Sequence, residues 1–245
     1  MIARLFDYAD FTSELYTSYA FIPGWENLNR KAWENFALTE GLEKLGALKG
    51  VGLGLGCGRE ALLRVFPQRL NYSIVIDTAY VSKDCYPWEH FTPRQIQEWS
   101  GIDESRLLVL PADMRQIPFK EESFDVVWSN SSIEHIGDVS TVLHCFADIE
   151  RVLRPDGVCG ITTEWNLTGT KEVVYFHQMV CFDYNLLRMI SQAAPGLQLV
   201  EEPNVERSTH PSNQCRGYLA GRTHDVRWPV DFTSVSLFWR KRDGS

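Results

Sequence analysis

A glycine-rich segment and two acidic residues beyond it have the types and spacing needed to bind a nucleoside. Gly54, Gly56 and Gly58 follow an apolar run and precede a helix-compatible stretch. Glycines at such a turn let the backbone approach a ligand closely, and free N–H groups of the next helix face it. Asp77 ends the second apolar run, where a carboxylate would accept both hydroxyls of a ribose. Asp113 ends the third run, where a carboxylate can meet an adenine amino group.

The same segment lacks a cradle for phosphates. A dinucleotide fingerprint that starts at Gly54 needs a glycine where Arg59 stands, and one that starts at Gly52 needs a glycine where Cys57 stands. The lysine and hydroxyl residue of a phosphate-binding loop are also missing after these glycines. The pattern therefore favours a nucleoside ligand without phosphates. The competing interpretation is a tight strand-to-helix turn that binds nothing.

Short apolar runs alternate with helix-compatible stretches through the middle of the chain. The predicted strands are 50–56, 72–79, 106–113, 123–131 and 157–165, and the predicted helices are 59–68 and 138–153. The second helix places Val142, Phe146, Ile149 and Leu153 on one face. Continuous apolar strands of this length are typical of a parallel sheet covered on both faces, which predicts an α/β sandwich. In such sheets, ligands bind at the carboxyl ends of the strands.

The two ends of the chain depart from this alternation. The runs 197–202 and 232–241 have no convincing helix between them, which predicts an antiparallel final hairpin. Residues 1–45 are aromatic-rich and mostly helix-compatible, with a break at Pro23 and Gly24. We therefore expect one domain over 1–245, with a helical N-terminal lid over 1–45 and the core over 46–245.

Composition excludes several classes of protein. The chain has 245 residues, 44% of them hydrophobic, so it can bury a sizeable core and is not intrinsically disordered. A formal net charge of −8 argues against a surface that wraps nucleic acid. No stretch approaches the ~20 apolar residues that span a bilayer. The 6 cysteines include no CxxC pair, so we expect free thiols, no metal site and a cytoplasmic location.

Several segments of the chain together resemble the class I S-adenosylmethionine-dependent methyltransferases. LGLGCGRE (53–60) is similar to the family's glycine motif, and VIDTA (75–79) to its ribose-binding strand end. PADMRQIPFKEESFDVVWSNSSIEHI (111–136) resembles the adenine-contacting acid and the fourth strand. ADIERVLRPDGVCGITTE (147–164) resembles a helix, a turn and the fifth strand. The resemblance implies a Rossmann-like three-layer sandwich, whose mostly parallel seven-stranded sheet has an antiparallel final strand.

The resemblance also implies the cofactor S-adenosylmethionine, with S-adenosylhomocysteine as its product. The cofactor-binding residues that it implies are Gly54, Gly56, Cys57, Gly58, Glu60, Asp77, Thr78, Asp113, Met114, Asn130 and Ser131. Two positions depart from the family's pattern. The family usually has an acid where Gly54 stands and a third glycine where Glu60 stands. Glu60 could compensate by meeting the α-amino group of the cofactor.

Structural roles compete with these assignments. Asp77 could cap a helix after its strand, and Asp113 could cap the turn from Met114 to Ile117. Ser131 could cap the next helix, with Glu134 completing a capping box. For Asp77 the ribose role is preferred; for Ser131 the two interpretations weigh about equally.

No universal catalytic residue is expected, because a base helps only when the acceptor must lose a proton. His135 and Glu164 are the candidates, since each lies just past a strand end, although His135 could also be a structural histidine. The segments expected to choose the acceptor are the N-terminal lid, 80–104, 164–195 and 203–231. Arg216, Arg222 and Arg227 in the last segment could recognise an anionic group or lie in a solvated loop.

The sequence favours methyl transfer to a small organic acceptor: a sugar, a natural product or a metabolite, on oxygen or nitrogen. The alternatives are an RNA methyltransferase and a non-catalytic module with the same fold. We expect neither nucleic acid nor a membrane as a partner, and a homodimer is left open.

Overall fold

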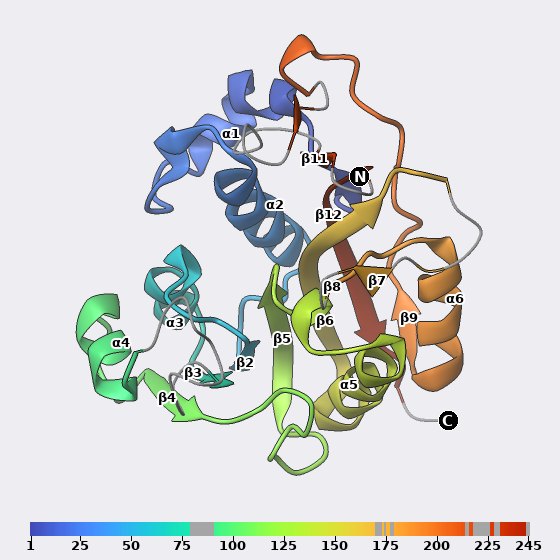
Figure 1. Ribbon diagram of the computed structural model, residues 1–245. Coiled ribbons are helices and arrows are strands. Elements are labelled where there is room, and N and C mark those ends of the chain that lie inside the picture. The colour runs from blue at the N-terminus through green and yellow to red at the C-terminus, as the bar shows by residue number, and fades with distance from the viewer. Residues whose placement is uncertain are drawn as a thin grey trace.

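The protein is described by a computed structural model (Figure 1) over residues 1–78, 91–169, 173, 175–176, 179–213, 216–217, 226–227 and 231–243. The strands are β1 (Arg4–Leu5), β2 (Val51–Leu55), β3 (Tyr72–Asp77), β4 (Leu107–Pro111), β5 (Phe124–Asn130), β6 (Leu153–Asn166), β7 (Tyr175–Phe176), β8 (Met179–Val180), β9 (Leu197–Leu199), β10 (Arg216–Gly217), β11 (Val226–Arg227) and β12 (Asp231–Lys241). The α-helices are α1 (Glu14–Ser18), α2 (Arg30–Lys44), α3 (Phe66–Arg69), α4 (Pro93–Ser100), α5 (Val139–Val152) and α6 (Tyr184–Ala193). Single turns of 3-10 helix are η1 (Tyr8–Thr12), η2 (Trp25–Asn27), η3 (Ala61–Arg64), η5 (Ile133–His135) and η6 (Pro211–Asn213).

One mixed sheet organises the molecule. Its order is β10-β11-β12-β6-β5-β2-β3-β4, with β1 and β9 also paired to β12. Strands β2 to β6 are mutually parallel, and β12 is antiparallel to β6 and to β9. The predicted parallel sheet with an antiparallel final strand is confirmed. The described sheet has ten strands rather than seven, because the two-residue strands β1, β10 and β11 extend its antiparallel side.

The sheet separates two apolar cores, as a sandwich with helices on both faces requires. Along β5, Val127 packs with α5 and α6, whereas Val126 and Trp128 pack with α2, α3 and α4. The side chains alternate because successive residues of a strand point to opposite faces. Figure 1 shows α5 and α6 together on the right of the view and α3 and α4 on the left. This arrangement is the predicted three-layer α/β sandwich.

Helix α5 confirms the helix predicted over 138–153 from the spacing of its apolar residues. Val142, Phe146 and Ile149 are fully buried on its inner face. Asp138 caps the helix, because its carboxylate accepts from the backbone N–H of Thr141 at 2.9 Å. Leu153, predicted on the same helix face, is instead the first residue of β6.

The helix predicted over 59–68 is broken. The structure has the 3-10 turn η3 followed by the single α-turn α3, which begins at Phe66 with Pro67 in its first turn. A proline cannot donate in a helix interior and its ring clashes with the preceding turn, so it is tolerated only where a helix starts. Pro67 therefore divides the segment in two.

The N-terminal 45 residues pair and pack with the sheet, and their role as a lid stays a prediction. Arg4 and Leu5 pair with Ser236 and Val235 of β12. Helix α2 covers β6 and β12, and its Trp33 and Phe36 are buried in the core. The short helices η1, α1 and η2, which lie between β1 and α2 in the chain, are at the top of Figure 1. No helix within the described ranges is long and apolar enough to cross a membrane.

Candidate functional site

The turn after β2 is held against the end of β3. Gly56 and Gly58 have φ values of +65° and +47°, in the left-handed region that favours glycine. The backbone N–H of Gly56 donates to the carbonyl of Ile76 at 2.9 Å, and that of Gly58 donates to Oδ2 of Asp77 at 2.7 Å. The structure thus brings the predicted glycine turn and the predicted ribose-binding acid into direct contact.

The exits of two other strands close around this turn. A Cβ atom at Gly56 would lie 2.3 Å from Cε of Met114, after β4, and 2.6 Å from Cβ of Ser132, after β5. The hydroxyl of Ser132 donates to the carbonyl of Gly56 at 2.7 Å. Residues from four strand ends therefore meet here, and Gly56 is required both by its φ and by its neighbours.

Asp113 leaves the sheet on the strand next to Asp77, since Asp77 is in register with Pro111. Its carboxylate is engaged by Arg115, with Oδ2 at 2.7 Å from Nε and Oδ1 accepting the Arg115 backbone N–H at 2.9 Å. Burial raises the pKa of Asp113, but the bonds from Arg115 outweigh it and lower the pKa below its ordinary value. The turn-capping interpretation is thus observed, and the adenine contact stays a prediction.

Glu60 lies beside the same turn and is held by β5. Its Oε1 accepts from Nε1 of Trp128 at 2.9 Å. Burial raises the pKa of the Glu60 carboxyl to about 7, and the bond from Trp128 offsets only part of that effect. Cys57 is a buried thiol whose pKa is raised by burial and by Glu60, so it is neutral at physiological pH. It can serve a ligand through its backbone only.

Asn130 and Ser131, at the exit of β5, have different surroundings. The side chain of Asn130 donates to Oδ1 of Asn35 at 2.9 Å and accepts from Oγ1 of Thr162 at 2.6 Å, which ties β5 to α2 and β6. Ser131 has a φ of +51°, and its buried Oγ has no hydrogen-bond partner among the described residues. The alternative of a capping box between Ser131 and Glu134 is therefore not observed: Ser132, not Ser131, precedes η5, and no side chain caps it.

The two catalytic candidates lie in contrasting environments. His135 is 46% exposed, with Nε2 3.9 Å from Oε1 of Glu134. Glu164 is buried near the end of β6 and forms an ion pair with Arg30 of α2. The structure thus leaves His135 accessible and engages Glu164 with a cation. A role as base remains a prediction for both residues.

Arg30 belongs to a buried charge cluster that the sequence did not mark. The cluster is Arg30, Glu34, Glu134 and Glu164. Arg30 Nη1 donates to Oγ of Ser234 at 2.7 Å and lies 3.4 Å from Oε1 of Glu34. Burial lowers the pKa of Arg30, but Glu164 and Glu34 raise it above its ordinary value. The guanidinium is therefore charged and binds two carboxylates at once.

Among the described residues, Glu134 is the carboxylate of the cluster that has no lysine or arginine within ion-pair distance. It is fully buried, and its Oε2 accepts from Oγ1 of Thr163 at 3.1 Å. Its Oε1 has no hydrogen-bond partner among the described residues. Burial and the neighbouring Glu164 raise the pKa of Glu134 above its ordinary value. Sequence reasoning assigned this residue to a cap, because nothing in the local pattern shows that a glutamate after β5 will be buried.

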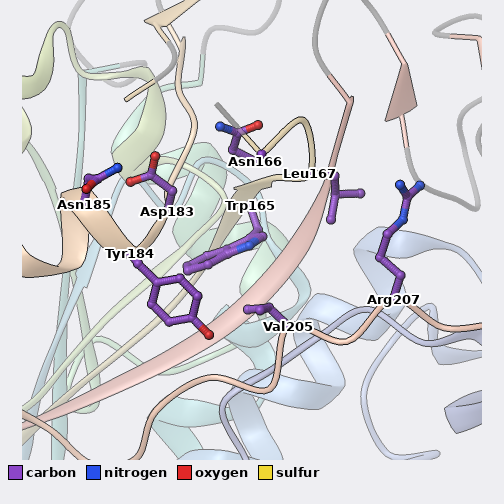
Figure 2. Close-up of a pocket in the computed structure, with 9 residues that line it drawn as sticks. Trp165, Asn166, Leu167, Asp183, Tyr184, Asn185, Val205 and Arg207 are labelled. Atoms are coloured by element: carbon purple, nitrogen blue, oxygen red, sulfur yellow. The ribbon is translucent and has the colours of Figure 1, made fainter. Parts of the chain in front are cut away.

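A cavity of about 290 Å³ lies at the end of β6 (Figure 2). It is lined by Trp165, Asn166, Leu167, Gly169, Asp183, Tyr184, Asn185, Val205 and Arg207. The rings of Trp165 and Tyr184 meet edge to face, with centroids 5.2 Å apart. Its walls come from two of the segments predicted to choose the acceptor, 164–195 and 203–231.

Other predictions fall in parts of the chain that the structure does not cover. Residues 79–90 lie outside the described ranges, and so do Arg222 and the side chains of Arg216 and Arg227. Within the described ranges, no group of three or more His, Cys, Asp or Glu side chains could hold a metal ion.

Comparison with known proteins agrees with this geometry. A family model described as a methyltransferase domain matches residues 53–161, which include the glycine turn and strands β3 to β5. Dimethylglycine N-methyltransferase of Parasynechococcus marenigrum is 29% identical over 127 residues, which are 52% of this chain and 40% of that protein. The chain therefore spans well under two thirds of that relative's length.

Solved structures share the fold. A protein of Galdieria sulphuraria, provisionally named a sarcosine dimethylglycine methyltransferase, superposes with a TM-score of 0.61 at 17% identity, over 94% of this chain and 99% of that one. The 1,6-didemethyltoxoflavin-N1-methyltransferase of Burkholderia thailandensis superposes with a TM-score of 0.57 at 18% identity, over 96% of this chain and 87% of that one. The latter structure holds 1,6-didemethyltoxoflavin and S-adenosylhomocysteine.

Proposed function

We propose that the chain, whose residues 53–161 match a methyltransferase-domain model, is a class I S-adenosylmethionine-dependent methyltransferase that transfers a methyl group to a small organic acceptor, on oxygen or nitrogen. The observation that carries the proposal is the contact between the glycine turn and Asp77, enclosed by Met114 and Ser132. A nucleoside without phosphates suits such a site, because carboxylates rather than a cradle of N–H groups surround it.

The residues at the strand ends fit the adenosine part of the cofactor. Gly56 lets the exits of β4 and β5 pack closely against the turn, since a side chain there would clash with Met114 and Ser132. The buried Oγ of Ser131, which lacks a partner among the described residues, is a polar atom that a bound group would satisfy. Asp77 would hold the ribose, and Asp113 would meet the adenine. When bound, the cofactor supplies the chemistry, because its sulfonium is already an activated methyl donor.

What remains for the protein is to orient the acceptor and to exclude water. The acceptor atom must lie in line with the methyl group at ~3 Å, so the walls around the acceptor decide which molecule is methylated. The cavity beside Trp165 and Tyr184 has the volume for a small organic molecule. The names of similar proteins, which refer to dimethylglycine, sarcosine and 1,6-didemethyltoxoflavin, support a small acceptor. The net charge of −8 argues against RNA.

Calorimetric titration with S-adenosylhomocysteine tests the cofactor site. We expect binding by the unchanged protein and a loss of about 30-fold or more in Asp77→Asn, because a charged acceptor of hydrogen bonds contributes about 1.5–3 kcal/mol. Asp156→Asn is the matched control, since Asp156 is an exposed residue near the start of β6, whereas the site lies at the ends of the parallel strands. Absence of binding at hundred-micromolar ligand would favour a non-catalytic module instead.

A screen of small amines, carboxylates and hydroxyl compounds tests the acceptor class. Release of S-adenosylhomocysteine would be measured with each compound and with bulk tRNA. Turnover with a small molecule supports the proposal, whereas turnover confined to tRNA would contradict it. His135→Ala and Glu164→Gln, tested with an active acceptor, would then show whether either residue serves as a base.

A further inference from the structure

Position 54 in the glycine motif has no room for a side chain. A Cβ atom at Gly54 would lie 2.4 Å from Sγ of Cys57 and 2.6 Å from the indole ring of Trp128. Real Cβ atoms do not approach other heavy atoms so closely, and both neighbours are buried and packed. The usual family acid therefore cannot be accommodated at this position without moving Trp128.

Trp128 both closes position 54 and reaches the residue at position 60. It is fully buried in β5, and its ring packs edge to face against Phe66 with centroids 5.2 Å apart. Its Nε1 donates to Oε1 of Glu60 at 2.9 Å. A single side chain thus excludes an acid from one end of the turn and holds a carboxylate at the other end.

The carboxylate of Glu60 has no ion-pair partner among the described residues. Its neighbours are the neutral donors Trp128 and Asn130, the thiol of Cys57 and the like-charged Asp77. The adjacent cation, Arg59, is directed elsewhere, with its guanidinium over the rings of Phe91 and Trp99. A partly buried carboxylate in such surroundings favours the arrival of a cation from outside the chain.

We propose that Glu60, oriented by Trp128, binds the α-ammonium group of the cofactor's methionine end and so replaces the acid that position 54 cannot hold. The inference rests on the proposed function, because it assigns one end of the same ligand. Asp77 holds the turn at Gly58, and Glu60 follows two residues later on the side of β5, so the two acids suit the two ends of one extended ligand.

Two ligands that differ only at the methionine end test the assignment. S-adenosylhomocysteine carries the ammonium group, and 5′-methylthioadenosine lacks the whole amino-acid part; neither carries a sulfonium charge. We expect Glu60→Gln to weaken S-adenosylhomocysteine about 10- to 30-fold and 5′-methylthioadenosine less than twofold, as measured by calorimetry at pH 8. Glu121→Gln, an exposed residue before β5, is the matched control and should change neither.

Equal losses for both ligands would overturn the inference, because they would mean that Glu60 only shapes the turn. An unchanged affinity for S-adenosylhomocysteine would overturn it too. Failure of the unchanged protein to bind either ligand is a different outcome, since that result would reject the proposed function itself.

Two further variants separate the roles of the indole and the carboxylate. Trp128→Phe keeps a ring against Gly54 and removes the N–H donor, so we expect a several-fold loss for S-adenosylhomocysteine alone. The triple variant Gly54→Asp, Trp128→Ala, Glu60→Gly moves the acid to position 54 and opens the space for it. If it melts cooperatively, we expect it to bind S-adenosylhomocysteine more tightly than Glu60→Gln does. A folded triple variant with no such recovery would contradict the exchange of positions.

Discussion

Two groups of carboxylates lie near the carboxyl edge of the sheet, and they differ in what neutralises them. Glu60 and Asp77 flank the glycine turn, where the described neighbours of Glu60 include no cation. Glu34 of α2 and Glu164 of β6 form the second group, and Arg30 binds both of them. The second group is thus neutralised within the chain and joins α2 to β6, whereas the cation proposed for Glu60 in the first group comes from a ligand.

Removing the cation of the buried cluster should have the largest effect. Arg30→Met leaves Glu34 and Glu164 buried without their shared partner, so we expect the free energy of unfolding to fall by about 3–5 kcal/mol, as for other broken buried pairs. Urea unfolding measures this change. Lys31→Met is the control, because the Lys31 side chain is 58% exposed and its pair with Glu34 contributes less. A loss below 1 kcal/mol in Arg30→Met would mean that the cluster is not a structural device.

A substitution at Glu134 should raise the free energy of unfolding, by less than Arg30→Met lowers it. Its pKa is raised on folding, so the folded protein binds more protons than the unfolded chain between the ordinary and the raised pKa. Stability is therefore lost as pH rises through that window. Glu134→Gln removes this loss, and we expect it to match the unchanged protein at pH 5 and to exceed it by about 2 kcal/mol at pH 8.5.

Urea unfolding at the two pH values checks that prediction. The charged groups that act on Glu134 are Glu164, Lys31 and Glu34. Thr163 donates a hydrogen bond to Glu134, so Thr163→Val is the control for the loss of that bond. If Glu134→Gln is less stable than the unchanged protein at both pH values, the prediction is wrong, because the ionised carboxylate of Glu134 would then have a partner that stabilises it.

The smallest effect expected is a pH dependence of ligand binding at the turn. Burial raises the pKa of Glu60 to about 7, and an ammonium ligand binds its ionised form. The affinity for S-adenosylhomocysteine should therefore rise about 10-fold at most between pH 6 and pH 8, as the ionised fraction of Glu60 increases. Glu60→Gln should flatten this profile in calorimetry. A rise that persists in the variant would assign the titration to another group.

The sequence predicted the parts of the fold that depend on local pattern. Strands β2 to β5 and helix α5 lie where apolar runs and a helical periodicity place them. It was wrong where two local rules compete, as at Pro67, which divides the helix predicted over 59–68. At Ser131 the sequence left a capping box and a chemical role equally open, and the structure removes the first, because η5 begins after Ser132.

In the candidate site, too, one part could be predicted from the sequence and another could not. The glycine turn and Asp77 lie close together because two parallel strands end at one edge, and the spacing of glycines and acids along the chain was enough to predict that proximity; their direct hydrogen bond was not predicted. Glu60 could be named as an oddity of the motif, but its partner Trp128 could not, because a tryptophan in a buried strand is ordinarily a packing residue.

The order of apolar runs, turns and strand-end acids is therefore encoded locally, since side-chain periodicity and glycine conformation act within a few residues. Which charges neutralise each other was decided only by the tertiary structure. Arg30 meets Glu164 across 134 positions of the chain, and Trp128 reaches Glu60 across 68. Such pairs form because the sheet stacks remote segments, and low solvent access then makes each buried charge depend on whatever neighbour packing provides.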